Sequence, residues 1–77
     1  MTLKIISSED VIFQGEVTSV TLPGAMGEFT VLRNHASLVS ALVPGTMKYV
    51  ADGVTVPVDV QGGLVDVDNN VVSVCIY

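Results

Sequence analysis

Valine occupies every second position through much of the last third of this 77-residue sequence. Over residues 54–61 it alternates with Thr, Pro, Asp and Gln, and residues 65–68 read Val-Asp-Val-Asp. A period of two places successive side chains on opposite faces of an extended strand, whereas a helix repeats about every 3.6 residues. These segments are therefore predicted to be β-strands with one buried face and one wet face.

Turn signals divide the rest of the sequence into further short strands. Pro-Gly-Ala-Met-Gly at 23–27, Asp-Gly at 52–53, Gly-Gly at 62–63 and Asn-Asn at 69–70 are combinations typical of turns. Pro57 cannot donate a ladder hydrogen bond, so its strand is expected at a sheet edge or beside a bulge. The remaining strands are expected at residues 3–8, 11–22, 28–32, 37–43, 46–51 and 71–76.

Two of these segments depart from a simple strand pattern. Within residues 11–22 the apolar positions are odd-numbered up to Val17 and even-numbered from Val20. A β-bulge produces such a one-residue phase slip, and Gly15 is placed to ease the bend. Residues 37–43 also fit one or two helical turns, but their shortness and the Pro-Gly that follows favour a strand.

Strands at this short, regular spacing predict a single all-β domain over residues 1–77, a two-sheet β-sandwich or flattened barrel. The composition agrees, because 49% of residues are hydrophobic and only 5% aromatic, with valine dominant. A chain of this size buries only about 60% of its unfolded surface, so support from a partner is expected. Cys75 is the sole cysteine, which excludes an internal disulfide and a Cys-based metal site.

The formal net charge of −5, with Lys4, Arg33 and Lys48 the only cationic side chains, argues against a nucleic-acid partner and against anionic membrane surfaces. The mean hydropathy is +0.63, but the longest charge-free stretch, residues 34–47, contains polar residues, Pro and Gly. It falls short of the roughly 20 apolar residues of a spanning helix. No signal-peptide pattern opens the sequence, so a cytosolic bacterial-type protein without direct lipid insertion is expected.

No set of side chains predicts an active site. His35 is the only histidine, and its neighbours Asn34 and Ala36 offer neither a second ligand nor a partner acid. A structural or interface role is therefore favoured over catalysis or metal binding. Asp66 and Asp68 share a strand face but lack the spaced ligands of a calcium loop, so a solvated face is favoured. We expect no enzyme activity, no cofactor and no metal.

A competing hypothesis is that the chain is a lipoyl- or biotinyl-carrier domain, with Lys48 as its modified lysine. Those domains are small acidic β-sandwiches with the lysine on a hairpin turn, flanked by Met or small residues. Met47 fits this pattern, but Tyr49 breaks it, and Lys48 falls within an expected strand. An unrelated β interaction module is the third hypothesis.

Residues 23–36, PGAMGEFTVLRNHA, carry a more specific signal. They resemble the epsilon subunit of the F-type ATP synthase, in which a glycine turn precedes Gly-Glu, a Val/Ile-Leu pair and His-Ala. Further pieces follow in the family's order: FQGEV at 13–17, VPG at 43–45, GGLVDV at 62–67 and NVVSV at 70–74. Each piece alone is weak, but the ordered set covers nearly the whole chain.

Two substitutions depart from the family pattern, since Thr30 stands where many members have Gly and Ser37 where Pro often follows His-Ala. Typical members also continue into a C-terminal helical hairpin that carries an inhibitory motion and, in some, ATP binding. The sequence stops at Tyr77. Neither property is expected of this chain.

The resemblance implies a non-catalytic subunit of the central-stalk rotor, peripheral to the cytoplasmic side of a bacterial inner membrane. Its expected partners are the gamma subunit and the polar loops of the membrane c-ring. Family c-ring loops commonly carry a cation, so Glu28 is the first candidate contact, with a solvated turn charge as the alternative. The expected c-ring rim is Gly24, Gly27, Glu28, Arg33 and His35. The expected gamma contacts are Ser7, Ser8, Gly62, Gly63 and Leu64, taken as exposed small residues that admit close backbone approach.

Overall fold

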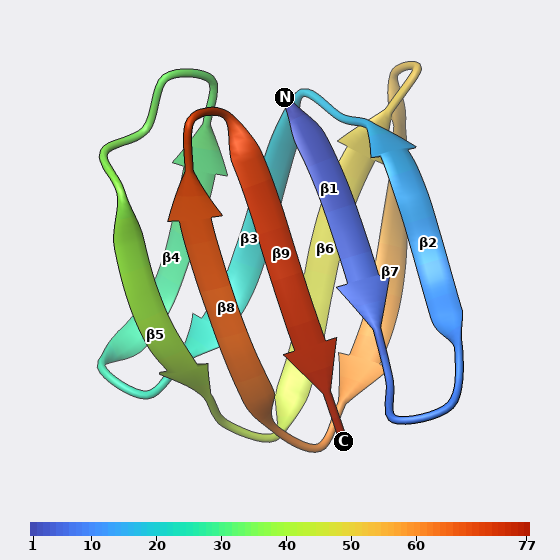
Figure 1. Ribbon diagram of the computed structural model, residues 1–77, viewed down its shortest axis with the longest axis vertical. Coiled ribbons are helices and arrows are strands. Elements are labelled where there is room, and N and C mark those ends of the chain that lie inside the picture. Colours follow the sequence, from blue (N-terminus) through green and yellow to red (C-terminus); the bar gives the residue numbers. More distant parts are fainter.

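The computed structural model describes residues 1–77 and contains strands only. The strands are β1 (Thr2–Ile6), β2 (Val11–Glu16), β3 (Ser19–Gly24), β4 (Gly27–Leu32), β5 (Leu38–Leu42), β6 (Gly45–Ala51), β7 (Val54–Val60), β8 (Gly63–Asp68) and β9 (Val71–Ile76). They form two packed layers, so the predicted all-β sandwich is confirmed (Figure 1). No helix of membrane-spanning length is found.

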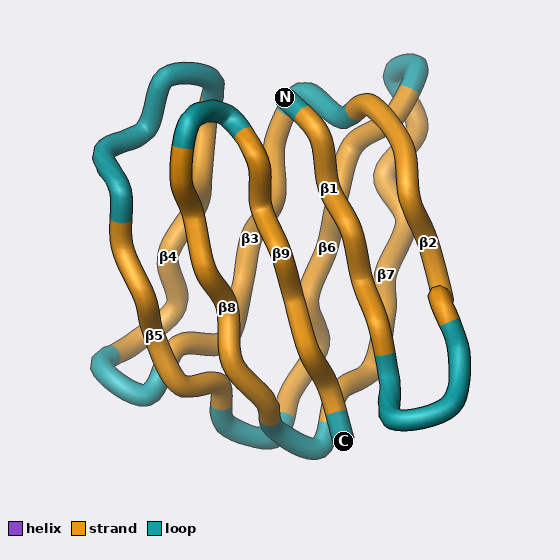
Figure 2. The backbone as a smooth tube through the Cα atoms, in the orientation of Figure 1, coloured by secondary structure: helices purple, strands orange, loops and turns teal.

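The front layer has the order β5-β8-β9-β1-β2 and the rear layer β4-β3-β6-β7 (Figure 1). All neighbouring strands are antiparallel except β1 and β9, which pair in parallel. The layers are joined on one side by a single ladder contact between Gly24 of β3 and Leu42 of β5. On the other side β2 and β7 are the edge strands, so the sandwich is a flattened barrel that stays open there (Figure 2).

The core lies between the layers and contains no polar or charged side chain. Phe13 of β2 and Tyr49 of β6 close its open side, with ring centroids 4.4 Å apart. Such aromatic pairs add to the stability gained from burial alone. The buried residues are Leu3, Ile5, Val17, Val20, Leu22, Val31, Leu42, Met47, Tyr49, Val60, Val65, Val67, Val72, Val74 and Ile76.

The single strand expected over residues 11–22 is wrong, because two strands of different layers occupy this stretch. The chain leaves the front layer after Glu16 and enters the rear layer at Ser19. At the corner, the Val17 N–H donates to the Met1 carbonyl and the Thr18 N–H to the Val50 carbonyl. The phase slip therefore marks the point where the chain passes from the front layer to the rear layer. The core lies on opposite sides of the two layers, so the alternation of buried residues changes phase there without a bulge.

The tight turns take the expected conformations. Asp52-Gly53 has φ values of 51° and 75°, and Asn69-Asn70 has 48° and 61°. Positive φ at both central residues is the mirror-image turn that matches the twist of a hairpin, and Asn, Asp and Gly tolerate it best. Residues 38–42 form strand β5, which settles the strand–helix ambiguity in favour of the strand.

Strand β7 lies at the edge of the rear layer, as Pro57 predicts. Only some of its alternating valines are buried. Val60 is buried, Val56 and Val58 are half-buried, and Val54 is 60% exposed. Because β7 is an edge strand, a neighbouring strand covers only one of its two sides.

Candidate docking surfaces

The five residues expected to form the c-ring rim lie at opposite ends of the sandwich, so they do not form one contiguous surface. Gly24 ends β3, and Gly27 and Glu28 begin β4, so these three residues flank the β3–β4 turn, whereas Arg33 and His35 lie in the β4–β5 loop. Strand β4 runs the height of the molecule between them (Figure 1). Five residues of extended chain separate Glu28 from Arg33, which corresponds to roughly 16 Å.

The β3–β4 turn is held firmly at its base. Gly24 is buried, and a Cβ there would lie 2.7 Å from the Phe29 ring and 2.8 Å from the Gly27 carbonyl oxygen. Its role is therefore to leave space, because only Gly27 of the two has a positive φ, of 120°. The Ala25 N–H donates to the Ala41 carbonyl at 2.9 Å and ties the turn to β5.

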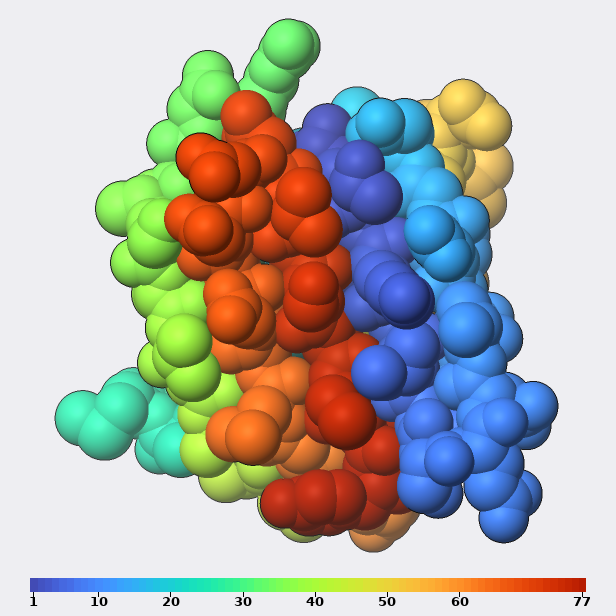
Figure 3. All heavy atoms as spheres, viewed as in Figure 1, coloured from blue at the N-terminus to red at the C-terminus, as the bar shows by residue number.

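The tip of this turn projects from the molecule and is seen as teal spheres at the lower left of Figure 3. Met26 is 99% exposed, and Glu28 is also exposed. The one ion pair in the chain joins the Met1 ammonium to Glu16, so Glu28 has no cationic partner. A rigid base with an unpaired carboxylate beside its tip is suited to contact a cationic surface.

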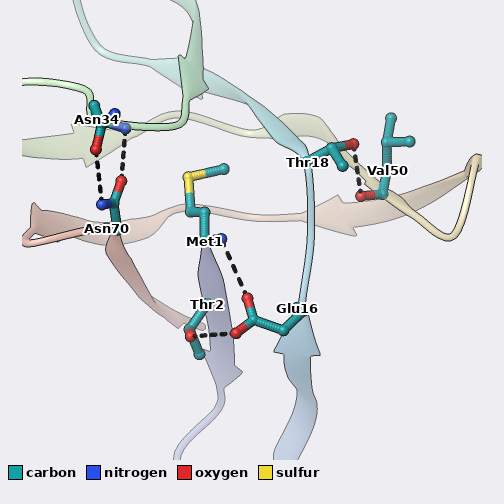
Figure 4. Close-up of polar contacts among 7 residues, drawn as sticks. All are labelled: Met1, Thr2, Glu16, Thr18, Asn34, Val50 and Asn70. Atoms are coloured by element: carbon teal, nitrogen blue, oxygen red, sulfur yellow. Dashed lines mark hydrogen bonds and ion pairs between the residues drawn. The ribbon is translucent and has the colours of Figure 1, made fainter.

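The β4–β5 loop at the other end is fastened to the β8–β9 turn by a pair of asparagines (Figure 4). The Asn34 N–H donates to Asn70 Oδ1 at 2.6 Å, and Asn70 Nδ2 donates to Asn34 Oδ1 at 3.0 Å. Arg33 is exposed without a carboxylate partner. His35 is half-buried, and its Nδ1 lies 2.7 Å from the Ala36 carbonyl oxygen, which accepts the bond.

Two of the expected gamma contacts are not exposed, which corrects the expectation on Gly62 and Gly63. Both glycines are buried. A Cβ on Gly62 would lie 3.0 Å from the Tyr77 ring, and one on Gly63 would collide with the Cys75 carbonyl oxygen. Their φ values of 143° and 150° are accessible to glycine alone. The turn therefore needs these glycines for its own packing.

The other expected gamma contacts border a shallow hollow on the outer face of the front layer. Leu64 is 55% exposed and lines this hollow, of about 340 Å³, together with Ile6, which directly precedes Ser7. Ser7 is half-buried and Ser8 exposed in the β1–β2 loop. Hydrophobic and polar side chains thus form one continuous surface over β1, β8 and β9.

Neither surface gathers groups for chemistry. No three His, Cys, Asp or Glu side chains lie close enough together to hold a metal ion. Asp66 and Asp68 are exposed on β8, and Asp68 accepts a hydrogen bond from Ser37 Oγ at 2.7 Å. Lys48 lies within β6 opposite Pro57 rather than at a hairpin turn, which is the strand position expected from the sequence.

Sequence reasoning missed the asparagine pair and the exposed tip of the turn. Asn34 and Asn70 are 36 positions apart, so only the fold brings them together. The exposure of Met26 could have been inferred from its place in the Pro-Gly-Ala-Met-Gly turn, because turns and loops run over the protein surface.

Residues 1–76 match the family described as the ATP synthase delta/epsilon chain, beta-sandwich domain. The chain belongs to this family. ATP synthase epsilon chains are among its relatives: that of Gloeobacter violaceus is 38% identical over 96% of this chain, and that of Bordetella petrii is 41% identical over 96%. That of a Sulfurovum species is 48% identical over 88%.

Solved structures agree with this assignment. A chain in the Euglena gracilis mitochondrial ATP synthase, described as OSCP/F1/c-ring, superposes with a TM-score of 0.90 at 26% identity and covers 96% of this chain. A chain in the central stalk and c-ring of the Tetrahymena thermophila enzyme gives a TM-score of 0.85. Its 13% identity supports the fold alone.

This member of the epsilon family spans only part of its relatives. The chain covers 56% of the Gloeobacter protein, 53% of the Bordetella protein and 48% of the matched Euglena chain. The β-sandwich is therefore the part for which the comparison holds.

Proposed function

We propose that this protein is a non-catalytic subunit of the central-stalk rotor of an F-type ATP synthase, where it links the gamma subunit to the c-ring. The observation that carries the proposal is the match of residues 1–76 to the beta-sandwich domain of the ATP synthase delta/epsilon chain family. The 0.90 superposition on a chain of an F1/c-ring assembly supports it. Such a subunit works at the cytoplasmic side of a bacterial inner membrane, as a peripheral part of the complex.

The c-ring contact is assigned to the β3–β4 turn. Gly24 and Gly27 shape the turn, and Glu28 presents an unpaired carboxylate beside its projecting tip. A carboxylate of this kind pairs with a cation on a c-ring polar loop and contributes mainly to orientation and encounter rate. The hydrogen bond from the Ala25 N–H to the Ala41 carbonyl ties the turn to β5 and limits its conformational freedom.

The gamma contact is assigned to the outer face of the front layer near Leu64, with Ser7 and Ser8 at its margin. Leu64 and Ile6 offer apolar surface within one hollow, which a side chain of a partner can fill. Gly62 and Gly63 support this surface from beneath, because they set the path of the chain into β8.

The proposed role needs a rigid link between two partners and no catalysis by the domain itself. The core is entirely apolar, and close-packed interiors of this kind have low compressibility. Such a core holds the two surfaces in fixed relation, so a force applied at one surface is transmitted to the other without deforming the domain.

The proposal is tested by co-purification. An affinity-tagged chain is expressed with the gamma subunit of its own complex, and the eluate is examined after a high-salt wash. A stoichiometric gamma band is expected, because the contact is largely apolar and resists screening. Recovery of the folded chain without gamma would contradict the proposal.

A further inference from the structure

Two unpaired charges of opposite sign flank strand β9 on the outer face of the front layer, the face seen in Figure 3. Lys4 of β1 pairs with Ser73 of β9, which pairs on its other side with Asp66 of β8. All three residues are exposed. The one ion pair in the chain joins the Met1 ammonium to Glu16, so neither Lys4 nor Asp66 has a partner of opposite charge.

An apolar row lies next to this charged row. Ile6 of β1 and Leu64 of β8 lie opposite Cys75 of β9, and all three line the hollow described above. Ser73 and Cys75 have shorter side chains than their neighbours on β1 and β8, so β9 forms the floor of the hollow. Leu64 is 55% exposed, and Cys75 is also exposed. Exposed apolar surface bordered by charges is typical of a surface that a protein partner covers.

This pattern is complementary to a second copy of itself. In a two-fold symmetric dimer, a residue on one side of the axis meets the residue that lies on the other side of it in the second copy. With the axis parallel to β9 and between the two faces, β1 of one copy lies over β8 of the other. Lys4 then faces Asp66 of the second copy, and Ile6 faces Leu64 of the second copy. Each of these contacts occurs twice.

The charges also select the direction of the axis. An axis that ran across the strands would set Lys4 against Lys4 and Asp66 against Asp66, and like charges placed opposite each other are repulsive. The axis along β9 avoids this. It also sets Asp68 opposite Thr2 of the second copy, because both residues pair with Val71 in the adjacent row.

The size of the face determines how strong such a dimer is. The two longer extents of the molecule are 25 and 24 Å, and the layers are stacked along the shortest extent of 18 Å (Figure 1). Full contact therefore buries roughly 600 Å² on each copy, which is at the low end for specific complexes. The formal net charge of −5 on each copy opposes association. The expected dimer is weak and reversible, with a dissociation constant on the order of 100 μM.

We infer that the free chain forms a two-fold symmetric dimer through the outer face of its front layer, with Lys4 and Asp66 paired between the two copies. The inference does not rest on the proposed function. The two meet at one surface, because the gamma contact is assigned to the same face near Leu64. A second copy therefore covers the hollow in the free chain, and gamma competes with it.

Charge reversal tests the pairing, with the dissociation constant measured by sedimentation velocity between about 5 μM and about 500 μM. The parent chain is expected to pass from monomer toward dimer across this range. Lys4→Glu and Asp66→Lys are each expected to raise the dissociation constant about tenfold or more, because symmetry makes each reversal act twice. Lys48→Glu is the matched control. It makes the same charge change at an exposed residue of β6 in the rear layer and is expected to stay within about twofold of the parent chain.

An equimolar mixture of the two reversed chains separates pairing from folding. In the mixed dimer, the introduced carboxylate of Lys4→Glu faces the introduced ammonium of Asp66→Lys, and the remaining Asp66 faces the remaining Lys4. The mixture is therefore expected to recover dimer that neither variant forms alone, with a dissociation constant within about threefold of the parent value. Variants that had lost their fold would not regain association on mixing.

Cys75 reports the geometry, because it lies at the axis. Sheets packed face to face are about 10 Å apart, so the two Cys75 thiols point at each other and are within reach of a short bis-maleimide. The control chain carries Cys75→Ser and Ala41→Cys. Ala41 is exposed in the same row, opposite Leu64 on β5, and two thiols there lie about 20 Å apart in the dimer. The parent chain is expected to be cross-linked and the control chain is not.

The inference is overturned by a parent chain that stays monomeric at about 500 μM. It is equally overturned by reversed chains that do not associate on mixing, or by cross-linking of the control chain as readily as of the parent chain. A monomeric chain that still binds the gamma subunit leaves the proposed function standing. A chain that dimerises as described but does not bind gamma keeps this inference and contradicts the proposed function.

Discussion

Gly63→Ala separates a structural role for the β7–β8 turn from a role in binding. A Cβ at this position would collide with the Cys75 carbonyl oxygen and lie 3.0 Å from Ile76 Cα, at a φ of 150°. The backbone strain costs about 1–3 kcal/mol and the overpacking about 1–3 kcal/mol. The expected loss is therefore roughly 2–6 kcal/mol, set against a total stability of roughly 4–12 kcal/mol for a domain of this length.

Gly53→Ala is the matched control, since Gly53 has a φ of 75° but nothing within 4 Å of a Cβ. Its expected loss is about 1–2 kcal/mol, from backbone strain alone. Both variants are unfolded in urea and followed by circular dichroism, where a slope of about 1 kcal/mol/M converts the difference into a midpoint shift. Equal midpoints would refute the packing argument. A Gly63→Ala protein of parental stability that fails to bind gamma would show instead that Gly63 belongs to the interface.

Three further predictions concern exposed and buried positions. Glu28→Lys is expected to reduce ATP-driven ion pumping in the reconstituted complex while leaving the melting temperature unchanged, because the side chain is exposed and unpaired; unchanged pumping would remove Glu28 from the c-ring contact. Leu64→Lys is expected to lower the affinity for gamma about tenfold without changing stability, since Leu64 is 55% exposed; an unchanged affinity, measured by interferometry, would show that gamma does not bind at β8. Leu22→Ala is expected to lower the free energy of unfolding by about 2–5 kcal/mol, whereas Leu32→Ala, at a residue that is 56% exposed, costs less than about 1 kcal/mol; similar losses in urea unfolding would contradict the assigned core.

Most of the strands could be predicted from local sequence patterns. Alternation depends only on neighbouring residues, and Asp52-Gly53 and Asn69-Asn70 adopt the turns that their chemistry favours. The corner at Val17 was misassigned as a bulge, because a phase slip looks the same whether a strand bulges or changes layers. That distinction depends on where Met1 and Val50 lie, and they are remote from each other in the sequence.

The candidate surfaces were harder to predict for the same reason. Residues 24–35 are contiguous in sequence, but β4 carries the second half of them to the far end of the molecule. Gly62 and Gly63 look like exposed turn glycines, and their burial comes from Tyr77 and Cys75, which are more than ten positions away. The ordered family motifs identified the family, but they did not encode which residues share a surface.

The central claim is that one rigid sandwich carries separate surfaces for gamma and for the c-ring. It is tested most directly by immobilising the chain and adding gamma and detergent-solubilised c-ring, each alone and then together, with the bound mass recorded. The account predicts that each binds alone and that the mass bound from the mixture equals the sum of the two. Mutual displacement, or failure of either partner to bind the folded chain, would contradict it.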